Sequence, residues 1–139
     1  AASPHLPDVD LLMVGDGPLR ASLESLAGEL GITDRVRFLG IRSDIPALMR
    51  AADAFALTSV SEAASLTLLE AMASGLPSLL THVGGNAELA RHEQEALLFP
   101  RADWAGCAAA IRRIFTDHAL AKRLGAAARV RAFERYRLD

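Results

Sequence analysis

Short apolar runs alternate with helix-like segments along the chain, and this alternation constrains the fold more than any other feature. The first run, Val9 to Val14, is almost continuously apolar and ends at Gly15-Asp16-Gly17-Pro18. Such runs are typical of strands buried on both faces of a parallel sheet. The next segment predicts a helix from Pro18 to about Leu30, because its apolar residues have helical spacing and Gly31 follows as a stop.

The alternation continues to the end of the chain. Further strands are predicted at residues 36–39, 54–57, 77–81 and 96–99, and further helices at residues 43–52, 65–74 and 87–91, with two more after Asp103 that divide near residues 116–117. Strands that alternate with helices imply βαβ crossovers, and hence an α/β fold with an open parallel sheet. Ligands bind such sheets beyond the carboxyl ends of the strands, so functional residues should follow strands.

The composition fits one compact domain and argues against several classes of protein. The chain has 139 residues, of which 51% are apolar and 23% charged, enough to build a core. Its net charge of −2 and the lack of a Lys/Arg-dense run argue against nucleic-acid binding, and the arginines near the C-terminus predict a solvated helix face. The single cysteine, Cys107, allows no intramolecular disulfide. With no signal peptide and no membrane-span-like run, we expect a cytoplasmic setting.

The segment SVSEAASLTLLEAMASGLP, residues 59–77, carries the residues that point to chemistry. Glu62 lies in the loop after the third predicted strand, Ser65 is placed to cap the next helix, and Glu70 lies within that helix. The first amides of a helix lack intrahelical partners and, with the helix dipole, form an anion site suited to phosphate. Here they belong to Leu66, Thr67 and Leu68. A carboxylate can accept two hydrogen bonds from a vicinal diol such as that of a ribose.

One helix start therefore predicts an anion site between two carboxylates that can bind hydroxyl groups. The alternative is a chance pair, because glutamate is a common helix former and two glutamates eight positions apart are frequent. The position of the pair at a strand-to-helix turn, where α/β folds bind ligands, favours the functional interpretation.

These residues resemble the E-x7-E signature of glycosyltransferase family 4 and its GT-B relatives, with Glu62 and Glu70 at the two signature positions. Further stretches match in the same order: LLMVGDGPLR resembles the family's strand and Gly-x-Gly-Pro turn, RVRFLG its nucleobase-flanking strand, and LLEAMASGLPSLLTHVGGNAEL its signature helix, next strand and Gly-Gly turn. The resemblance covers nearly all of residues 9–115. It implies a Rossmann-like GT-B C-terminal half, so that residues 1–139 form a partial nucleotide-sugar-binding domain with the acceptor domain absent.

The resemblance also implies roles for the residues around the predicted helix start. Glu70 matches the glutamate that binds the donor ribose hydroxyls. Glu62 matches the glutamate near the donor sugar, which makes it the candidate catalytic residue. Ser65 and Leu66 match positions whose backbone amides approach the diphosphate, and Thr67 belongs to the same donor-binding turn.

The first half of the chain supplies the other implied donor-binding residues. Gly15 and Gly17 match the turn beside the nucleotide. Arg37 and Phe38 match a segment whose backbone flanks the base, although an ordinary structural strand explains these two residues equally well.

Two departures from the family pattern stand out. The family commonly has Glu-Gly-Phe-Gly where this chain has Glu62-Ala63-Ala64-Ser65, which we interpret as a mark of a subfamily. The family's first strand–helix unit, with a Gly-Arg and a Lys that neutralise the diphosphate, has no counterpart in this sequence. That strand would lie between the strands at residues 9–14 and 54–57, so we expect exposed apolar edges there and a chain that is an excerpt of a longer protein.

The implied function is retaining transfer of a sugar from a nucleoside diphosphate sugar to an acceptor hydroxyl, in glycan or polysaccharide biosynthesis, by a hexosyltransferase. The partners are the nucleotide-sugar donor and an acceptor glycan or lipid-linked sugar bound by the missing domain, and the isolated chain should be inactive. No cofactor and no metal are expected, because amides and cations would meet the diphosphate charge. Two alternatives stay open: a non-catalytic nucleotide-binding module, and an epimerase or phosphorylase on a GT-B scaffold. Docking at the inner face of a membrane also stays open.

Three other residues invite functional interpretations. His82 follows the fourth predicted strand and is expected to be an exposed loop residue. Trp104 follows the predicted cap Asp103 and is expected to pack inward. Ser59 has no histidine partner nearby in the sequence, which argues against a hydrolase-type nucleophile.

Overall fold

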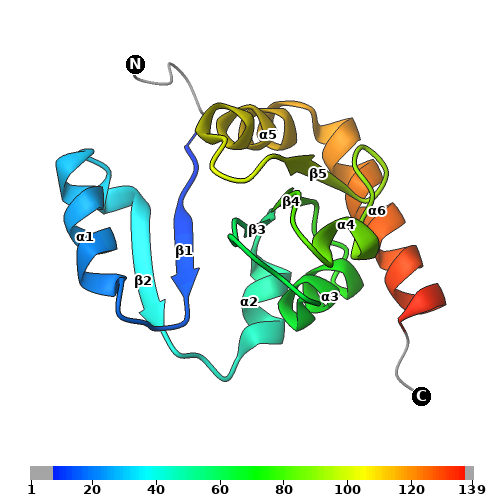
Figure 1. Cartoon of the computed structure of the whole chain (residues 1–139), viewed down its shortest axis with the longest axis horizontal. Coiled ribbons are helices and arrows are strands. Elements are labelled where there is room, and N and C mark those ends of the chain that lie inside the picture. The colour runs from blue at the N-terminus through cyan, green and yellow to red at the C-terminus, as the bar shows by residue number, and fades with distance from the viewer. Residues whose placement is uncertain (1–7, 137–139) are drawn as a thin grey trace. The chain divides into compact units, whose positions relative to one another are not determined.

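Helices and strands alternate through residues 8–136, the part of the chain that the computed structural model describes (Figure 1). These residues form two units, one ending at Ile45 and the other beginning at Pro46. The boundary falls at the start of helix α2 (Ile45–Ala51). Within the described residues no helix is both long and apolar enough to cross a membrane.

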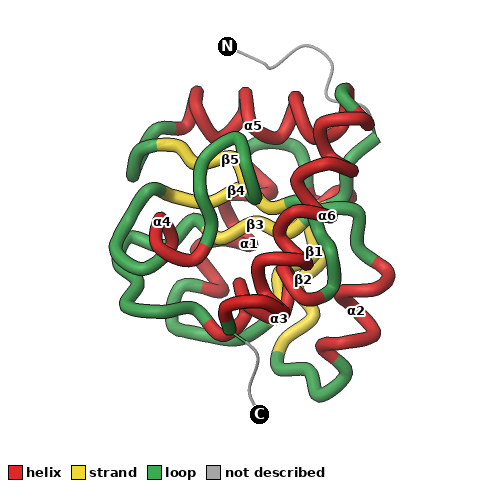
Figure 2. The backbone as a smooth tube through the Cα atoms, turned by 90° about the vertical axis from the view of Figure 1, so that its right-hand side faces the viewer, coloured by secondary structure: helices red, strands yellow, loops and turns green. Residues whose placement is uncertain are grey.

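The larger unit is built on a three-stranded parallel sheet in the order β3-β4-β5 (Figure 2). The strands are β3 (Phe55–Leu57), β4 (Ser78–Thr81) and β5 (Ala96–Phe99). Phe55 pairs with Ser78, and Ser78 pairs with Ala96, so the three strands begin level with one another. Helix α3 (Leu66–Ala73) connects β3 to β4, and the short helix α4 (Asn86–Leu89) lies between β4 and β5.

Helices cover both faces of this sheet. Adjacent side chains of a strand point to opposite faces, and in β4 Leu80 packs with α3 while Leu79 packs with α5 (Trp104–Thr116). All four β4 residues are buried, as expected for the middle strand of a parallel sheet. The last helix, α6 (His118–Arg135), contributes to the core on both faces. Leu120 and Leu124 pack with α5, whereas Ala128 and Ala132 pack with α3 and α4.

Three arginines of α6 bind main-chain carbonyls of other segments. Arg129 donates to the carbonyl of Ala73 at the end of α3 over 2.8 Å. Arg131 donates to the carbonyl of Leu89, the last residue of α4, over 2.7 Å, and also to Glu88. Arg123 donates to the carbonyl of Glu93. Arg123 and Arg129 are exposed, as the predicted solvated face requires, and Arg131 is half-buried. Their long side chains also reach carbonyls that helix ends and turns leave unpaired.

The smaller unit has a two-stranded parallel sheet of β1 (Leu11–Val14) and β2 (Val36–Gly40), joined by α1 (Arg20–Glu29) and a single 3₁₀ turn at Thr33–Arg35. The predicted burial of the first strand on both faces is wrong. Leu11 and Val14 are each 45% exposed, and Ala27 is the one buried apolar residue among residues 8–45. The reason is that, within residues 8–45, β1 pairs with β2 alone and α1 is the one α-helix available to cover the two strands.

The predicted open sheet is present in two pieces. Within residues 8–136 no strand pairs with both β1 and β3, so each of these strands has a partner on one side only.

Most predicted boundaries are confirmed within one or two residues, including the strand at residues 96–99 and the division between the last two helices at Asp117. The predicted inward packing of Trp104 is wrong. This residue is 81% exposed, because the buried positions of α5 begin in its second turn, with Ala110 and Ile114 as its fully buried residues.

Candidate functional site

The start of helix α3 is built as the sequence predicted. Ser65 is the N-cap, with extended backbone angles of φ −94° and ψ 112°, and its Oγ accepts a hydrogen bond from the amide of Leu68 over 3.1 Å. The Ser65 side chain is buried, and its Oγ also lies 2.9 Å from Oγ1 of Thr67. A cap held this firmly fixes the direction in which the first amides of the helix point.

The anion site has fewer available amides than predicted. The amide of Leu68 is occupied by Ser65, which leaves the amides of Leu66 and Thr67 as the two in this turn without a hydrogen-bond partner among residues 8–136. Both residues are exposed, and the Leu66 side chain is 74% exposed. Two unpartnered amides at the positive end of a helix are suited to a phosphate oxygen.

Glu70 lies one turn along α3 from Leu66, on the same face of the helix. It is exposed, and no described residue donates a hydrogen bond to its carboxylate. Both carboxylate oxygens of Glu70 are therefore available to a ligand.

Glu62 is held from within its own loop. Oγ of Ser59 donates a hydrogen bond to Oε1 of Glu62 over 2.7 Å, and the Glu62 side chain is half-buried. Oε2 of Glu62 has no partner among residues 8–136. The carboxylate is thus oriented at one oxygen and open at the other.

The loop of Glu62 rests directly on the turn after β4. The amide of Gly85 donates to the carbonyl of Glu62 over 3.0 Å. A Cβ on Gly84 would overlap the carbonyl of Glu62, and a Cβ on Gly85 would overlap the carbonyl of Ala63. Gly84 also has φ +42°, a value that glycine adopts most easily. The Gly-Gly pair therefore allows two backbone segments to approach more closely than any side chain would permit.

A second hydrogen bond holds the Glu62 loop at the end of β4. Oγ1 of Thr81 donates to the carbonyl of Ser59 over 2.7 Å, and Nδ2 of Asn86 donates to the carbonyl of Thr81 over 3.0 Å. Thr81 and Asn86 are both buried. Ser59, Thr81 and Asn86 were not predicted from the sequence to support the site. A Gly-Gly pair directly after a strand was a signal for close backbone approach, but it does not say which segment approaches.

The remaining predicted residues belong to the smaller unit. Gly15 follows β1 with φ +114°, and its amide donates to the carbonyl of Gly40 over 2.8 Å. The amide of Gly17 bonds to the side chain of Asp16. These contacts give the predicted nucleotide turn a defined shape at the carboxyl end of β1.

Arg37 and Phe38 lie within β2 and already have partners. The Arg37 guanidinium lies 3.6 Å from the carboxylate of Asp10, and the guanidinium of Arg20 lies 5.9 Å from the centre of the Phe38 ring. Their structural role in the strand is therefore observed, and their predicted contact with a base stays a prediction.

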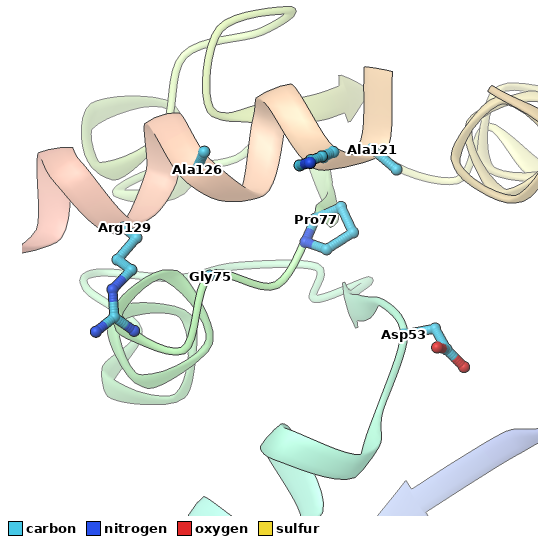
Figure 3. A pocket seen from close by; sticks show the side chains of 7 residues that line it. Asp53, Gly75, Pro77, Ala121, Ala126 and Arg129 are labelled. Carbon is cyan, nitrogen blue, oxygen red and sulfur yellow. The ribbon is translucent and has the colours of Figure 1, made fainter. Parts of the chain in front are cut away.

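A separate hollow lies at the opposite ends of the strands. Figure 3 shows it, and it is lined by Asp53, Gly75, Pro77, Ala121, Lys122, Ala126 and Arg129. Asp53 and Pro77 come just before β3 and β4, so the hollow is at the amino ends of these strands. Ligands of parallel α/β sheets bind at the carboxyl ends, where His82 lies exposed as predicted.

Potential metal ligands do not cluster in the described residues: no group of three or more His, Cys, Asp or Glu side chains could hold an ion there. The Cys107 thiol is half-buried, and burial, together with the nearby Asp103, raises its pKa. A thiol of this kind is a weak nucleophile.

The chain is similar in sequence to known bacterial proteins. The chain is 40% identical over 116 residues to the lipopolysaccharide core biosynthesis glycosyltransferase LpsD of Rhizobium meliloti (strain 1021), which covers 84% of this chain and 34% of that protein. It is 37% identical over 132 residues to the N-acetyl-alpha-D-glucosaminyl L-malate synthase of Bacillus anthracis, covering 95% of this chain and 35% of that protein. The chain spans about a third of the length of these curated relatives.

Solved structures show the same fold. Anabaena Alr3699/HepE in complex with UDP-glucose matches with a TM-score of 0.90 and 31% identity, over 94% of this chain and 38% of that one. WaaG, a glycosyltransferase involved in lipopolysaccharide biosynthesis, matches with a TM-score of 0.77 and 31% identity, over 88% of this chain and 33% of that one. The α/β architecture is therefore the Rossmann-like one of GT-B glycosyltransferases. The family model described as glycosyl transferases group 1 matches residues 1–131, and the chain belongs to this family.

Proposed function

We propose that this chain is the donor-binding part of a retaining glycosyltransferase, which moves a sugar from a nucleoside diphosphate sugar to an acceptor hydroxyl in glycan or polysaccharide biosynthesis. The observation that carries the proposal is the start of α3, where the two unpartnered amides of Leu66 and Thr67 lie in sequence between the carboxylates of Glu62 and Glu70. Similar solved structures hold UDP and UDP-glucose, which are ligands of this chemistry.

Each part of the donor has a group that suits it. The exposed Glu70 carboxylate can accept both hydroxyls of a ribose. The amides of Leu66 and Thr67 can bind a diphosphate oxygen, and they stabilise the charge that develops there as the sugar leaves. The free oxygen of Glu62 would face the donor sugar and bind its hydroxyls or polarise the site. Gly15 and Gly17 would border the nucleotide, and the backbone of Arg37 and Phe38 would flank its base.

We also propose that the reaction needs no metal ion. Fixed amides, together with cations from a part of the protein outside these residues, would supply the positive potential that a metal otherwise supplies to a diphosphate leaving group. On this proposal, those cations and the acceptor site belong to parts of the full-length protein beyond residues 1–139, so these residues alone should not transfer sugar.

The acceptor in this proposal is a glycan or a lipid-linked sugar. A relative that is 33% identical over 116 residues, from Escherichia coli, is named UDP-Gal:alpha-D-GlcNAc-diphosphoundecaprenol alpha-1,3-galactosyltransferase, and its name describes a lipid-linked acceptor. A lipid-linked acceptor would place the enzyme in the cytoplasm at the inner face of a membrane.

The test is a transfer assay with the full-length protein, a panel of labelled nucleoside diphosphate sugars and a panel of glycan and lipid-linked acceptors. We expect one donor to give a labelled product whose anomeric configuration, read by NMR, is the same as in the donor. Inversion would contradict the retaining mechanism. A changed sugar formed without acceptor would identify an epimerase instead, and nucleotide binding without turnover of any donor would identify a non-catalytic module.

A further inference from the structure

The loop that carries Glu62 is attached to the rest of the larger unit through its backbone. The carbonyl of Ser59 accepts from the buried hydroxyl of Thr81, and the carbonyl of Glu62 accepts from the amide of Gly85. In both hydrogen bonds the acceptor is a main-chain oxygen of the loop. The position of the loop therefore does not depend on which side chain residue 59 carries.

The Ser59 hydroxyl binds the side chain of Glu62 and not the backbone of the loop. It makes one side-chain hydrogen bond, to Oε1 of Glu62 over 2.7 Å. A free glutamate side chain samples many rotamers, and restricting them costs free energy. A hydrogen bond to one carboxylate oxygen removes much of that freedom before a ligand arrives, and it leaves the second oxygen without a partner among residues 8–136.

We propose that Ser59 is a positioning residue for Glu62, and this inference rests on the proposed function of the donor site. Thr81 fixes the backbone of Ser59, the Ser59 hydroxyl fixes one oxygen of Glu62, and the other oxygen is presented to the donor sugar. The strand end, the loop and the carboxylate thus form one preorganised support, of the kind that keeps a reacting group within a few tenths of an ångström of its working position.

The test compares three variants of the full-length protein. Ser59→Ala removes the hydroxyl but keeps both backbone ties, Ser59→Thr keeps a hydroxyl at the same position, and Ser61→Ala is the matched control. Ser61 directly precedes Glu62, is exposed, and makes no hydrogen bond among residues 8–136. Four quantities are measured for each protein: kcat and donor KM for sugar transfer, the calorimetric Kd for the free nucleoside diphosphate, and Tm.

We expect Ser59→Ala to lower kcat by roughly tenfold to a hundredfold, the size of effect that a misplacement of about 1 Å produces. The Kd for the nucleoside diphosphate and the Tm should stay close to the wild-type values, because Glu62 faces the sugar and the loop keeps its backbone ties. Ser59→Thr should recover most of kcat, and Ser61→Ala should match wild type.

Two outcomes would overturn the proposal. One is a kcat of Ser59→Ala equal to that of Ser61→Ala. The other is a parallel loss of kcat, nucleotide affinity and Tm in Ser59→Ala, which would make Ser59 an ordinary structural residue. A wild-type protein that neither binds a nucleoside diphosphate nor transfers sugar would instead refute the proposed function itself, so the two failures are distinguishable.

Discussion

The amide of Gly85 donates a hydrogen bond to the carbonyl of Glu62 over 3.0 Å, across 22 intervening residues of sequence. This contact places the candidate catalytic loop on the turn after β4. It is possible because position 85 has no side chain: a Cβ there would overlap the carbonyl of Ala63.

Gly85→Ala should therefore displace the Glu62 loop. We expect the free energy of unfolding, measured by urea denaturation, to fall by roughly 1–3 kcal/mol, the usual cost of forcing an extra carbon into a packed site. Transfer activity should fall as well. The control is Gly28→Ala in helix α1, where the nearest atom to a new Cβ is 4.0 Å away. It should stabilise the protein by about 0.5–1 kcal/mol, because alanine is the better helix former. Equal effects of the two substitutions would contradict the tight-contact explanation.

Two substitutions at Ser65 separate its capping role from anion binding. Ser65→Ala removes the hydrogen bond to the Leu68 amide and should destabilise the protein by about 1 kcal/mol. Ser65→Asp keeps a good cap but adds a negative charge beside the amides of Leu66 and Thr67. We expect nearly wild-type stability and at least about tenfold weaker calorimetric affinity for a nucleoside diphosphate, a loss of roughly 1.4 kcal/mol. Wild-type affinity in Ser65→Asp would show that the diphosphate does not bind at this helix start.

Glu70→Ala should weaken nucleotide binding. The lost hydrogen bonds to a charged group are worth roughly 1–3 kcal/mol, which is about a 5-fold to 150-fold rise in Kd by calorimetry with the full-length protein. The control is Glu134→Ala, because Glu134 is an exposed carboxylate of α6 without a salt bridge in the described part of the chain. It removes the same charge and should leave Kd unchanged. An unchanged Kd in Glu70→Ala would remove Glu70 from the ribose site.

The ion pair of Glu95 with Arg91 should make stability depend on pH. Burial alone would raise the pKa of the Glu95 carboxyl, but hydrogen bonds from the Arg91 side chain and amide outweigh burial and hold this pKa below its ordinary value. A lowered folded-state pKa adds stability that is complete above the unfolded-state pKa of about 4.3 and is lost as the pH falls through the folded value.

Glu95→Gln should therefore destabilise the protein most at neutral pH. At pH 7 we expect the substitution to lower the free energy of unfolding by about 1–2 kcal/mol. This is the lower part of the range for hydrogen bonds to a charged group, because the Arg91 side chain is half exposed and solvent weakens its interaction. The difference from wild type should shrink in urea titrations near pH 3.5. Glu134→Gln serves as the control and should show little difference at either pH. A constant penalty at both pH values would contradict a contribution from the charged form of Glu95.

Metal removal should leave the reaction intact. If the amides of α3 and cations elsewhere in the enzyme neutralise the diphosphate, excess EDTA should not change the initial rate of sugar transfer by more than about twofold. Recovery of a lost rate by Mg²⁺ or Mn²⁺ would show that a metal ion takes part.

Local signals explain why much of the fold was predictable. Ser65 at the start and Gly75 at the end delimit α3, and Asp103 and Asp117 begin the last two helices with side-chain hydrogen bonds to Gly106 and Leu120. Each of these signals acts over a few residues, so the sequence alone contains it. The anion site has two available amides where three were predicted, because the capping Ser65 side chain accepts a hydrogen bond from the third, that of Leu68.

Contacts between distant residues explain what could not be predicted. The exposure of Leu11 depends on which strands lie beside β1, and an apolar run does not encode its neighbours. The support of Glu62 by Gly85 and Thr81 joins segments about twenty residues apart. The sequence contained the Gly-Gly pair, but the partner of that pair is a property of the folded chain.

The most direct measurement is a crystal structure of the full-length protein with its nucleoside diphosphate sugar. We expect the ribose hydroxyls on the Glu70 carboxylate, a diphosphate oxygen within hydrogen-bond distance of the Leu66 and Thr67 amides, and the donor sugar beside the free oxygen of Glu62. A nucleotide bound elsewhere, with these amides and the Glu70 carboxylate in solvent, would contradict the assignment of this helix start as the donor site.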